Sequence, residues 1–211
     1  MDESLPSREL RDQFGDIDIY LFDQVLRGRF DRRWRILDAG CGDGRNLTYF
    51  LRTGFECFGV DDDPEAIRRV RQLAAELAPA LPQDHFRVAD IAHMPWADGD
   101  MDAVISSAVL HFVEDEAHFR TLMEEMWRVL APDGLFFGRL ASNIGLEDQI
   151  GPARRRARIP DGTDRFVVDE AMLREWTVRL GGQMIDPIKT TNVEGKRAMT
   201  TWCLVKKSAG K

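Results

Sequence analysis

The sequence has little cysteine, no long apolar run and no excess of positive charge, and each shortage excludes a class of protein. Its three cysteines stand far apart without the C-x-x-C spacing of a metal or redox site, so reduced thiols are expected. No stretch approaches the roughly 20 apolar residues that cross a bilayer, and the first ten residues carry no apolar run of signal-peptide type. A formal net charge of −7 disfavours an extended nucleic-acid footprint. We therefore expect a cytoplasmic protein with no metal site and no membrane insertion.

Length and composition bound the size of the core. A chain of 211 residues can bury one good core, and 44% apolar with 31% charged residues is ordinary globular composition rather than disorder. The sequence contains no internal repeat and no low-complexity segment. We therefore expect a single domain over residues 1–211, present as a monomer or a homodimer.

Short apolar runs alternate with helix-like periodicity between residues 34 and 140. The clearest helix covers 114–130, where Phe119, Met123 and Trp127 follow the 3.6-residue period. A helix over 63–77 begins with Asp63 as N-cap, followed by a proline at the first helical position. Because parallel strands need crossover connections, this alternation favours an α/β fold with a doubly wound, mostly parallel sheet. The other elements expected are strands at 35–40, 55–60, 85–90, 102–110 and 135–140, a helix at 45–54 and a turn at 131–134.

Both ends of the chain depart from this alternation. In the lead-in over 1–33, Ile19, Phe22 and Leu26 stand at helix-like spacing. Residues 141–165 read as polar and irregular, and long segments of this kind tend to be functional or mobile. The last elements expected are a helix over 169–180 and an antiparallel hairpin made of 184–193 and 198–207.

Three glycines on alternate positions, Gly40, Gly42 and Gly44, follow the first expected strand in "ILDAGCGDGRN". Glycine permits a tight turn and lets a ligand touch the backbone, and the helix behind the loop presents free N–H groups. The spacing is not the G-x-G-x-x-G of dinucleotide folds, because Arg45 stands where the third glycine should be and would obstruct a pyrophosphate. No P-loop lysine followed by Ser or Thr is present either. The loop therefore indicates a nucleoside ligand without a bridging phosphate.

An acid at the end of the second strand completes this pattern. A carboxylate at that strand tip, here Asp61, accepts hydrogen bonds from both hydroxyls of a ribose. Together the loop and the acid resemble the class I S-adenosylmethionine-dependent methyltransferases, a family with a seven-stranded Rossmann-like sheet. The resemblance covers about residues 34–140, and the C-terminal hairpin fits the family's reversed last strand. It implies S-adenosylmethionine as cofactor, and helices on both faces of a mostly parallel seven-stranded sheet.

The resemblance also implies roles for single residues. The glycine loop lies against the methionine part of the cofactor, where Asp38 orients the loop and bonds the amino group directly or through water. Asp61 takes the ribose, Asp90 accepts from the adenine amino group and Ile91 packs on the adenine ring. The position after the ribose acid is usually apolar but here is Asp62, so the adenine is stacked less firmly. The implied cofactor-binding residues are Asp38, Gly40, Cys41, Gly42, Gly44, Asn46, Asp61, Asp62, Asp90, Ile91, Ser106 and Ser107.

For two of these residues a structural role stays open beside the cofactor-binding one, and the resemblance also divides the chain into four parts. Cys41 is either a cofactor contact or a small filler, since methyl transfer from a sulfonium requires no covalent intermediate. Ile91 packs on the ring or belongs to the core. The implied division is an N-terminal helical lid (1–33), a cofactor-binding core (34–140), a variable substrate-side segment (141–168) and a C-terminal helix with the hairpin (169–211).

Two residues are candidates for catalysis. The reaction implied is an in-line displacement, in which alignment and exclusion of water matter most and a base helps only if the acceptor must lose a proton. His111 follows the fourth strand and is either a base or a residue packed against the next helix. Tyr20, with Phe14 and Phe22, either lines an acceptor pocket or anchors the lead-in helix. "SSAV" stands where enzymes acting on nucleobase amines or glutamine amides carry D/N/S-P-P-Y/F, which disfavours those substrates.

An arginine cluster, Arg154, Arg155, Arg156 and Arg158, lies in the polar segment. It either attracts an anionic substrate or a polyanionic partner, or forms a solvated surface. We interpret the chain as a small-molecule methyltransferase, because no separate domain for gripping RNA or protein is evident. The alternatives are an RNA or protein methyltransferase that docks its target on this cluster, a non-catalytic regulatory module that binds S-adenosylmethionine, and a nicotinamide oxidoreductase, which Arg45 disfavours.

Overall fold

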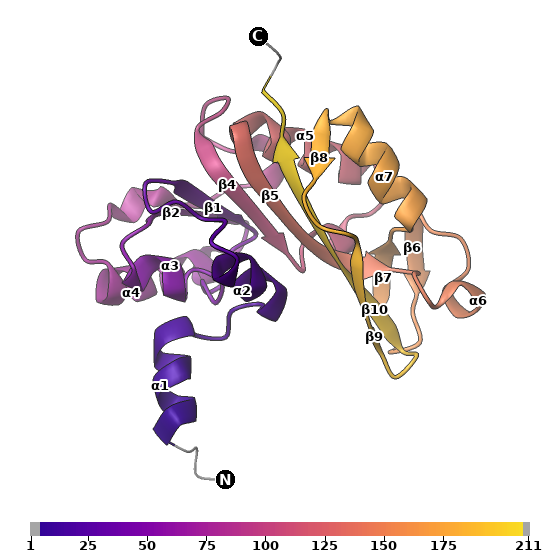
Figure 1. The fold of residues 1–211 in the computed structure, drawn as a ribbon, viewed down its shortest axis with the longest axis horizontal. Coiled ribbons are helices and arrows are strands. Elements are labelled where there is room, and N and C mark those ends of the chain that lie inside the picture. The colour runs from indigo at the N-terminus through magenta and orange to yellow at the C-terminus, as the bar shows by residue number, and fades with distance from the viewer. Residues whose placement is uncertain (1–4, 209–211) are drawn as a thin grey trace. The chain divides into compact units, whose positions relative to one another are not determined.

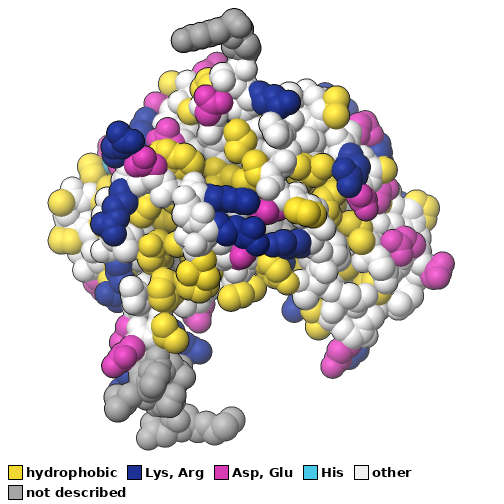
Figure 2. Space-filling model, viewed as in Figure 1, with side chains coloured by type: hydrophobic (Ala, Val, Ile, Leu, Met, Phe, Trp, Pro, Cys, Tyr) yellow, Lys and Arg dark blue, Asp and Glu magenta, His cyan; other side chains and the backbone are white. Residues whose placement is uncertain are grey.

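The computed structural model describes residues 5–208, which form two compact units divided after Ile91 (Figure 1). Unit 1 contains the described residues up to 91, and unit 2 contains residues 92–208. Charged side chains of both signs lie interspersed with hydrophobic ones on the face that Figure 2 shows. Within the described range, no helix is both long and apolar enough to cross a membrane.

Unit 1 is built around three parallel strands, as predicted. β2 (Glu56–Asp61) lies between β1 (Arg35–Ala39) and β3 (Phe86–Val88). The inner residues of β1 and β2 are buried, which suits their mostly apolar sequences, and the buried residues of β1 include Asp38. The helices of this unit are α1 (Leu5–Phe14), α2 (Ile19–Leu26), α3 (Thr48–Arg52) and α4 (Pro64–Leu77), followed by the short 3-10 turn η1 (Gln83–His85). A second 3-10 turn, η2 (Ile91–His93), crosses the boundary between the two units.

Helix α4 begins where the sequence predicts. The Asp63 side chain accepts a hydrogen bond from the backbone N–H of Glu65 at 2.9 Å, and Pro64 takes the first helical position. Ile67 and Val70 are fully buried, as expected of the core stripe. The cap and the stripe depend only on residues close together in the chain, which explains why the sequence alone was sufficient to predict the start and the buried face of α4.

Helix α2 forms as predicted, but the face that it buries is not the one that carries Ile19 and Leu26. Leu21 and Gln24 are buried, whereas Ile19 is 66% and Leu26 is 70% exposed. The helix has only eight residues, so it docks through a single turn rather than through a long stripe. The buried amide of Gln24 is satisfied because Arg29 donates to its Oε1 at 2.6 Å.

Unit 2 contains the parallel pair β4 (Met101–Ser107) and β5 (Leu130–Ser142). The predicted C-terminal hairpin is confirmed, because β9 (Lys189–Val193) pairs antiparallel with β10 (Arg197–Lys206). β10 also runs antiparallel to β5 and to β8 (Gly182–Met184). The helical elements here include η3 (Leu110–Phe112), α5 (Glu116–Val129) and α7 (Glu170–Arg179), and aspartates cap α5 and α7.

The turn expected at 131–134 is wrong. β5 runs through these residues, and the pairing with β4 shifts there, since Met101 pairs with Leu130 while Ala103 pairs with Leu135. Asp133 adopts a left-handed φ of +63° inside this irregularity. The Pro-Asp-Gly signal that indicates a turn therefore produces a bulge, because the strand is paired on both sides of it.

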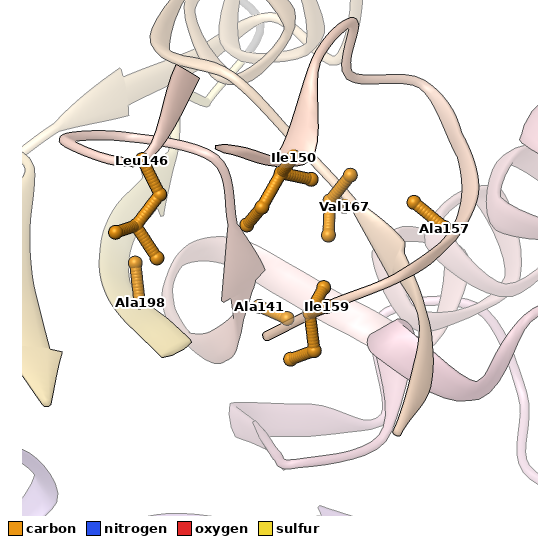
Figure 3. Packing of buried hydrophobic residues seen from close by; sticks show 7 residues of the cluster. All are labelled: Ala141, Leu146, Ile150, Ala157, Ile159, Val167 and Ala198. Carbon is orange, nitrogen blue, oxygen red and sulfur yellow. The ribbon is translucent and has the colours of Figure 1, made fainter. Parts of the chain in front are cut away.

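The segment 141–165 is more ordered than its polar sequence indicates. It contains α6 (Glu147–Ile150) and β6 (Arg155–Arg158), which pairs antiparallel with β7 (Asp164–Val167). Buried apolar side chains from several elements pack together around this hairpin (Figure 3). The members of this cluster are Ala141, Leu146, Ile150, Ala157, Ile159, Val167 and Ala198.

Parallel strands with intervening helices and antiparallel strands near the C-terminus confirm the α/β fold class. The functional division into 1–33, 34–140, 141–168 and 169–211 stays a prediction, as does the role of residues 1–33 as a lid.

Candidate functional site

The glycine loop has a backbone that only glycine adopts readily. Gly40, Gly42 and Gly44 have φ values of +80°, +52° and +85°, in the left-handed region. A Cβ on Gly42 would meet no atom within 4 Å, whereas a Cβ on Gly44 would lie 2.7 Å from Val70. The backbone of Gly42 is therefore open to a ligand, and Gly44 is required for packing against α4.

The Asp61 carboxylate holds this loop. One oxygen accepts from the backbone N–H of Gly42 at 2.9 Å, and the other accepts from the N–H of Asp63 at 3.0 Å. The end of β2, the glycine loop and the start of α4 are thus joined by one side chain. Each carboxylate oxygen has a second lone pair, so these bonds leave capacity for further donors.

Asp38 is a buried carboxyl without a hydrogen-bond partner. It lies near the end of β1, is 1% exposed, and neither of its oxygens finds a donor among residues 5–208. Burial raises the pKa of Asp38 to about 7, a rise opposed by the charge of Arg45 and the amide of Asn46 and increased by the charge of Asp61. A buried acceptor without a donor is costly, so the site favours a ligand that brings one.

The other residues implied in unit 1 have varied surroundings. Asn46 is buried, and its Oδ1 accepts from the backbone N–H of Asp18 at 3.0 Å. Asp62 and Asp90 are exposed, while Ile91 is buried. Burial raises the pKa of the Cys41 thiol well above its usual range, so Cys41 stays a thiol.

In unit 2, Ser106 and Ser107 end β4 and are both buried. The Ser106 hydroxyl has no hydrogen-bond partner among the described residues. His111 follows in η3, is 5% exposed, and its Nδ1 is likewise unpartnered within the described part of the chain. Burial and then the charge of Arg165 lower the pKa of His111 to about 4, so the imidazole is neutral at physiological pH.

The aromatic residues of the lead-in lie against one another. The rings of Phe14 and Phe22 meet edge-to-face at 4.7 Å, and Phe14 stacks on Tyr49 of α3 at 5.4 Å. This arrangement supports the anchoring role that the sequence left open for the two phenylalanines. Tyr20 is partly buried, and its backbone N–H donates to the Asp18 side chain that caps α2.

The predicted arginine cluster is largely neutralised. Arg154 pairs with Glu175 at 2.6 Å, Arg156 with Glu114 at 3.5 Å and Arg158 with Asp164 at 3.1 Å. Arg155 donates to the carbonyl of Pro152. Arg154 and Arg156 thus join the hairpin region to other elements, whereas the Arg158 pair lies within the β6–β7 hairpin. Sequence reasoning missed Arg165 of β7, whose charge reaches His111, because its lack of an acidic partner is visible only in the fold.

No group of His, Cys, Asp and Glu side chains in residues 5–208 is arranged to hold a metal ion. Asp38, the open backbone at Gly42 and Asp61 instead offer two acidic groups beside a bare main chain, and the two acids are close enough to influence each other's charge. Such a set suits a ligand with an amino group and sugar hydroxyls and without phosphate.

Comparison with known proteins points the same way. Residues 37–138 match the model of a methyltransferase domain family. An uncharacterized methyltransferase of Bacillus subtilis, YodH, is 29% identical over 121 residues, covering 57% of this chain and 48% of that protein. A probable S-adenosylmethionine-dependent methyltransferase of Mycobacterium tuberculosis is 28% identical over 193 residues, covering 81% of this chain and 67% of that protein. The chain thus spans about half to two thirds of these relatives.

The likeness to a solved structure covers more of the chain than the family match does. The Burkholderia thailandensis 1,6-didemethyltoxoflavin-N1-methyltransferase, with bound 1,6-didemethyltoxoflavin and S-adenosylhomocysteine, has a TM-score of 0.69 at 18% identity and covers 96% of this chain and 83% of that chain. The chain therefore shares the fold of this solved methyltransferase. Residues 37–138, the part that matches the methyltransferase domain family, contain the glycine loop and Asp61.

Proposed function

We propose that this protein is an enzyme that transfers a methyl group from S-adenosylmethionine to a small-molecule acceptor. The observation that carries the proposal is the unpartnered, buried carboxyl of Asp38 beside the open backbone of Gly42. The methyltransferase domain over residues 37–138 supports it. The B. thailandensis enzyme, which has this fold, acts on a small molecule.

The residues of unit 1 fit the cofactor. Asp38 would bind its amino group, because an ammonium supplies the donors that the buried carboxyl lacks. The second lone pairs of the Asp61 oxygens would accept from the ribose hydroxyls. Gly40, Cys41, Gly42, Gly44 and Asn46 would lie along the methionine part. We further assign Asp62, Asp90 and Ile91 to the adenosine, and Ser106 and Ser107 to the methionine side.

When bound, S-adenosylmethionine supplies a methyl carbon already activated by its positive sulfur. The chain's own contribution is then to orient the acceptor and to exclude water. His111 is a neutral imidazole and could accept a proton at a ring nitrogen, although its lowered pKa makes it a weak base. Tyr20 is the second candidate, and it would contact the acceptor.

Two rival functions make different predictions. An RNA or protein methyltransferase would need a docking surface, but three of the four arginines proposed for it form ion pairs within the hairpin region. A regulatory module would bind the cofactor and turn over no acceptor. We expect the small-molecule enzyme to act in the cytoplasm as a monomer or homodimer, a setting that suits its three buried free cysteines.

The test is a calorimetric titration with S-adenosylmethionine, followed by incubation of the complex with labelled methyl donor and a panel of small acceptors. We expect saturable one-site binding and label transfer to at least one acceptor. NAD serves as the control ligand and should give no heat. Binding without transfer, together with a stable protein partner, would favour the regulatory module, and salt-sensitive RNA binding lost on replacing Arg155 and Arg156 would favour the RNA methyltransferase.

A further inference from the structure

Arg165 differs from the other arginines of the β6–β7 hairpin. Its Nη1 donates to the carbonyl oxygen of the adjacent Asp164 at 2.9 Å. No carboxylate within residues 5–208 forms an ion pair with it, although Arg154, Arg156 and Arg158 each pair with an acid. Its Nε and Nη2 form no hydrogen bond with the described residues. Arg165 is thus a half-buried cation with donors to spare.

The acid whose pKa responds to the charge of Arg165 is Asp161. Burial opposes ionisation of Asp161, but its pKa is lowered overall by hydrogen bonds from Thr163 and by the charges of Arg165 and Arg197. Even so, the two side chains form no ion pair. A partly desolvated guanidinium without a counter-charge is costly, so its position favours an anion supplied from outside the chain.

An aromatic ring lies directly beside this cation. The Cζ atom of Arg165 is 4.7 Å from the centroid of the Phe112 ring. Phe112 is 54% exposed, while the neighbouring His111 is buried with its ring 4.4 Å from that of Phe112. Arg156 fixes the same turn, since its Nη1 donates to the Phe112 carbonyl at 2.8 Å. The exposed ring is therefore held in place rather than loose.

The position of this pair in unit 2 is that of a ligand site. η3, which carries Phe112, follows β4 directly, and the β6–β7 hairpin that carries Arg165 follows β5. Because β4 and β5 are parallel, their carboxyl ends lie at the same edge. Ligands of α/β folds bind outside the carboxyl ends of the strands, and β7 packs against η3 there.

We propose that Arg165 and Phe112 form a subsite that recognises an aromatic carboxylate as the methyl acceptor, an assignment that rests on the proposed function. The free Nε and Nη2 edge of the guanidinium matches the two oxygens of a carboxylate. The exposed part of the Phe112 ring offers an apolar contact for the ring of the acceptor. Since the other arginine–acid pairs of the hairpin leave little net charge, the subsite suits a small monoanion better than a polyanion.

The subsite can be tested by binding alone, without turnover. The probes are benzoate and benzamide, which share a ring and differ in charge, titrated into the full-length protein and followed by NMR. We expect wild type to bind benzoate at least about tenfold more tightly than benzamide. Arg165→Gln should bring the ratio of the two dissociation constants to about one, and Arg165→Lys should keep part of the preference because a lysine lacks the planar fork.

The matched control is Arg158→Gln, which removes an arginine of the same hairpin that is already paired with Asp164. It should leave the ratio unchanged, whereas Phe112→Leu should weaken both probes and keep the ratio. Equal binding of the two probes to wild type, or a preference that survives Arg165→Gln or is lost in Arg158→Gln, would overturn the proposal. S-adenosylhomocysteine is titrated into the same samples, so failure of cofactor binding in wild type counts against the proposed function separately.

Discussion

The carboxylate of Asp61 accepts a hydrogen bond from the backbone N–H of Gly42 at 2.9 Å, across 19 positions of sequence. This bond fixes the glycine loop against the end of β2. The same side chain, by its position, is the one proposed to bind the ribose of the cofactor. The loop proposed to receive the methionine part and the acid proposed to receive the sugar are thus joined by a hydrogen bond.

Replacing Asp61 should therefore weaken cofactor binding in two ways. Asp61→Ala removes the ribose acceptor and the bond to Gly42, and hydrogen bonds to charged groups are worth about 1.5–3 kcal/mol. We expect S-adenosylhomocysteine to bind at least tenfold more weakly by calorimetry. Asp61→Asn, which keeps one acceptor oxygen, should lose less. The control Asp84→Ala removes an exposed acid in η1, and unchanged affinity in Asp61→Ala would contradict the placement of the ribose.

Two glycines of the loop should respond differently to substitution. A side chain on Gly42 meets no protein atom within 4 Å, so Gly42→Val should fill the ligand's space and abolish binding while the fold stays largely intact. A Cβ on Gly44 lies 2.7 Å from Val70 and 3.0 Å from Leu73, so Gly44→Val should chiefly lower stability. Both carry the strain of a left-handed φ. Thermal unfolding and calorimetry together separate the effects, and equal losses of stability would show this distinction to be wrong.

Asp38 should make the stability of the free protein depend on pH. Its pKa rises from 3.8 to about 7 on folding, so the folded state holds a proton that the unfolded state has lost. Stability should fall as pH rises between these values and stay level above them. Asp38→Asn remains neutral, so its stability relative to wild type should increase by up to about 1.4 kcal/mol per pH unit within that window. Urea unfolding at several pH values measures this, and a constant difference between the two proteins would refute it.

The same carboxyl should couple cofactor binding to protons. A ligand ammonium favours the charged carboxylate, so S-adenosylhomocysteine should bind more tightly as pH rises through about 7 and should release a proton below it. Calorimetry in buffers of different ionisation enthalpy counts the proton. In Asp38→Asn the proton release should disappear. Release that persists in this variant would assign it to another group.

His111→Ala tests the assignment of His111 as a base. We expect the affinity for S-adenosylhomocysteine to stay nearly unchanged. If the imidazole accepts a proton in the reaction, turnover of an acceptor that wild type methylates should fall, and the wild-type rate should show no step from His111 above about pH 5, because its pKa lies near 4. Full turnover in the variant removes His111 as the base.

The sequence was informative wherever a feature is local. The Asp63 cap and the buried stripe of α5 depend on neighbours within a few residues, and the structure confirms both. Features that depend on distant partners were missed. Arg155 to Arg158 give β6 a sequence with almost no apolar alternation, so its pairing with β7 comes from the apolar cluster around the hairpin.

The candidate site divides in the same way. The glycine loop and Asp61 could be recognised from spacing, since strand, turn and acid follow one another along the chain. The bond from Gly42 to Asp61 and the unpartnered carboxyl of Asp38 are tertiary facts. Arg165 looked like one more arginine in a basic segment, and only the acids paired with Arg154, Arg156 and Arg158 set it apart.

The central claim is that a phosphate-free sulfonium nucleoside occupies the main chain of residues 40–44. A crystal structure of the complex with S-adenosylhomocysteine tests it most directly. We predict both ribose hydroxyls within hydrogen-bond distance of Asp61 and the amino group of the ligand on the side of Asp38. Electron density for the nucleoside at any other place, with the Asp61 oxygens bonded only to Gly42 and Asp63, would contradict the account.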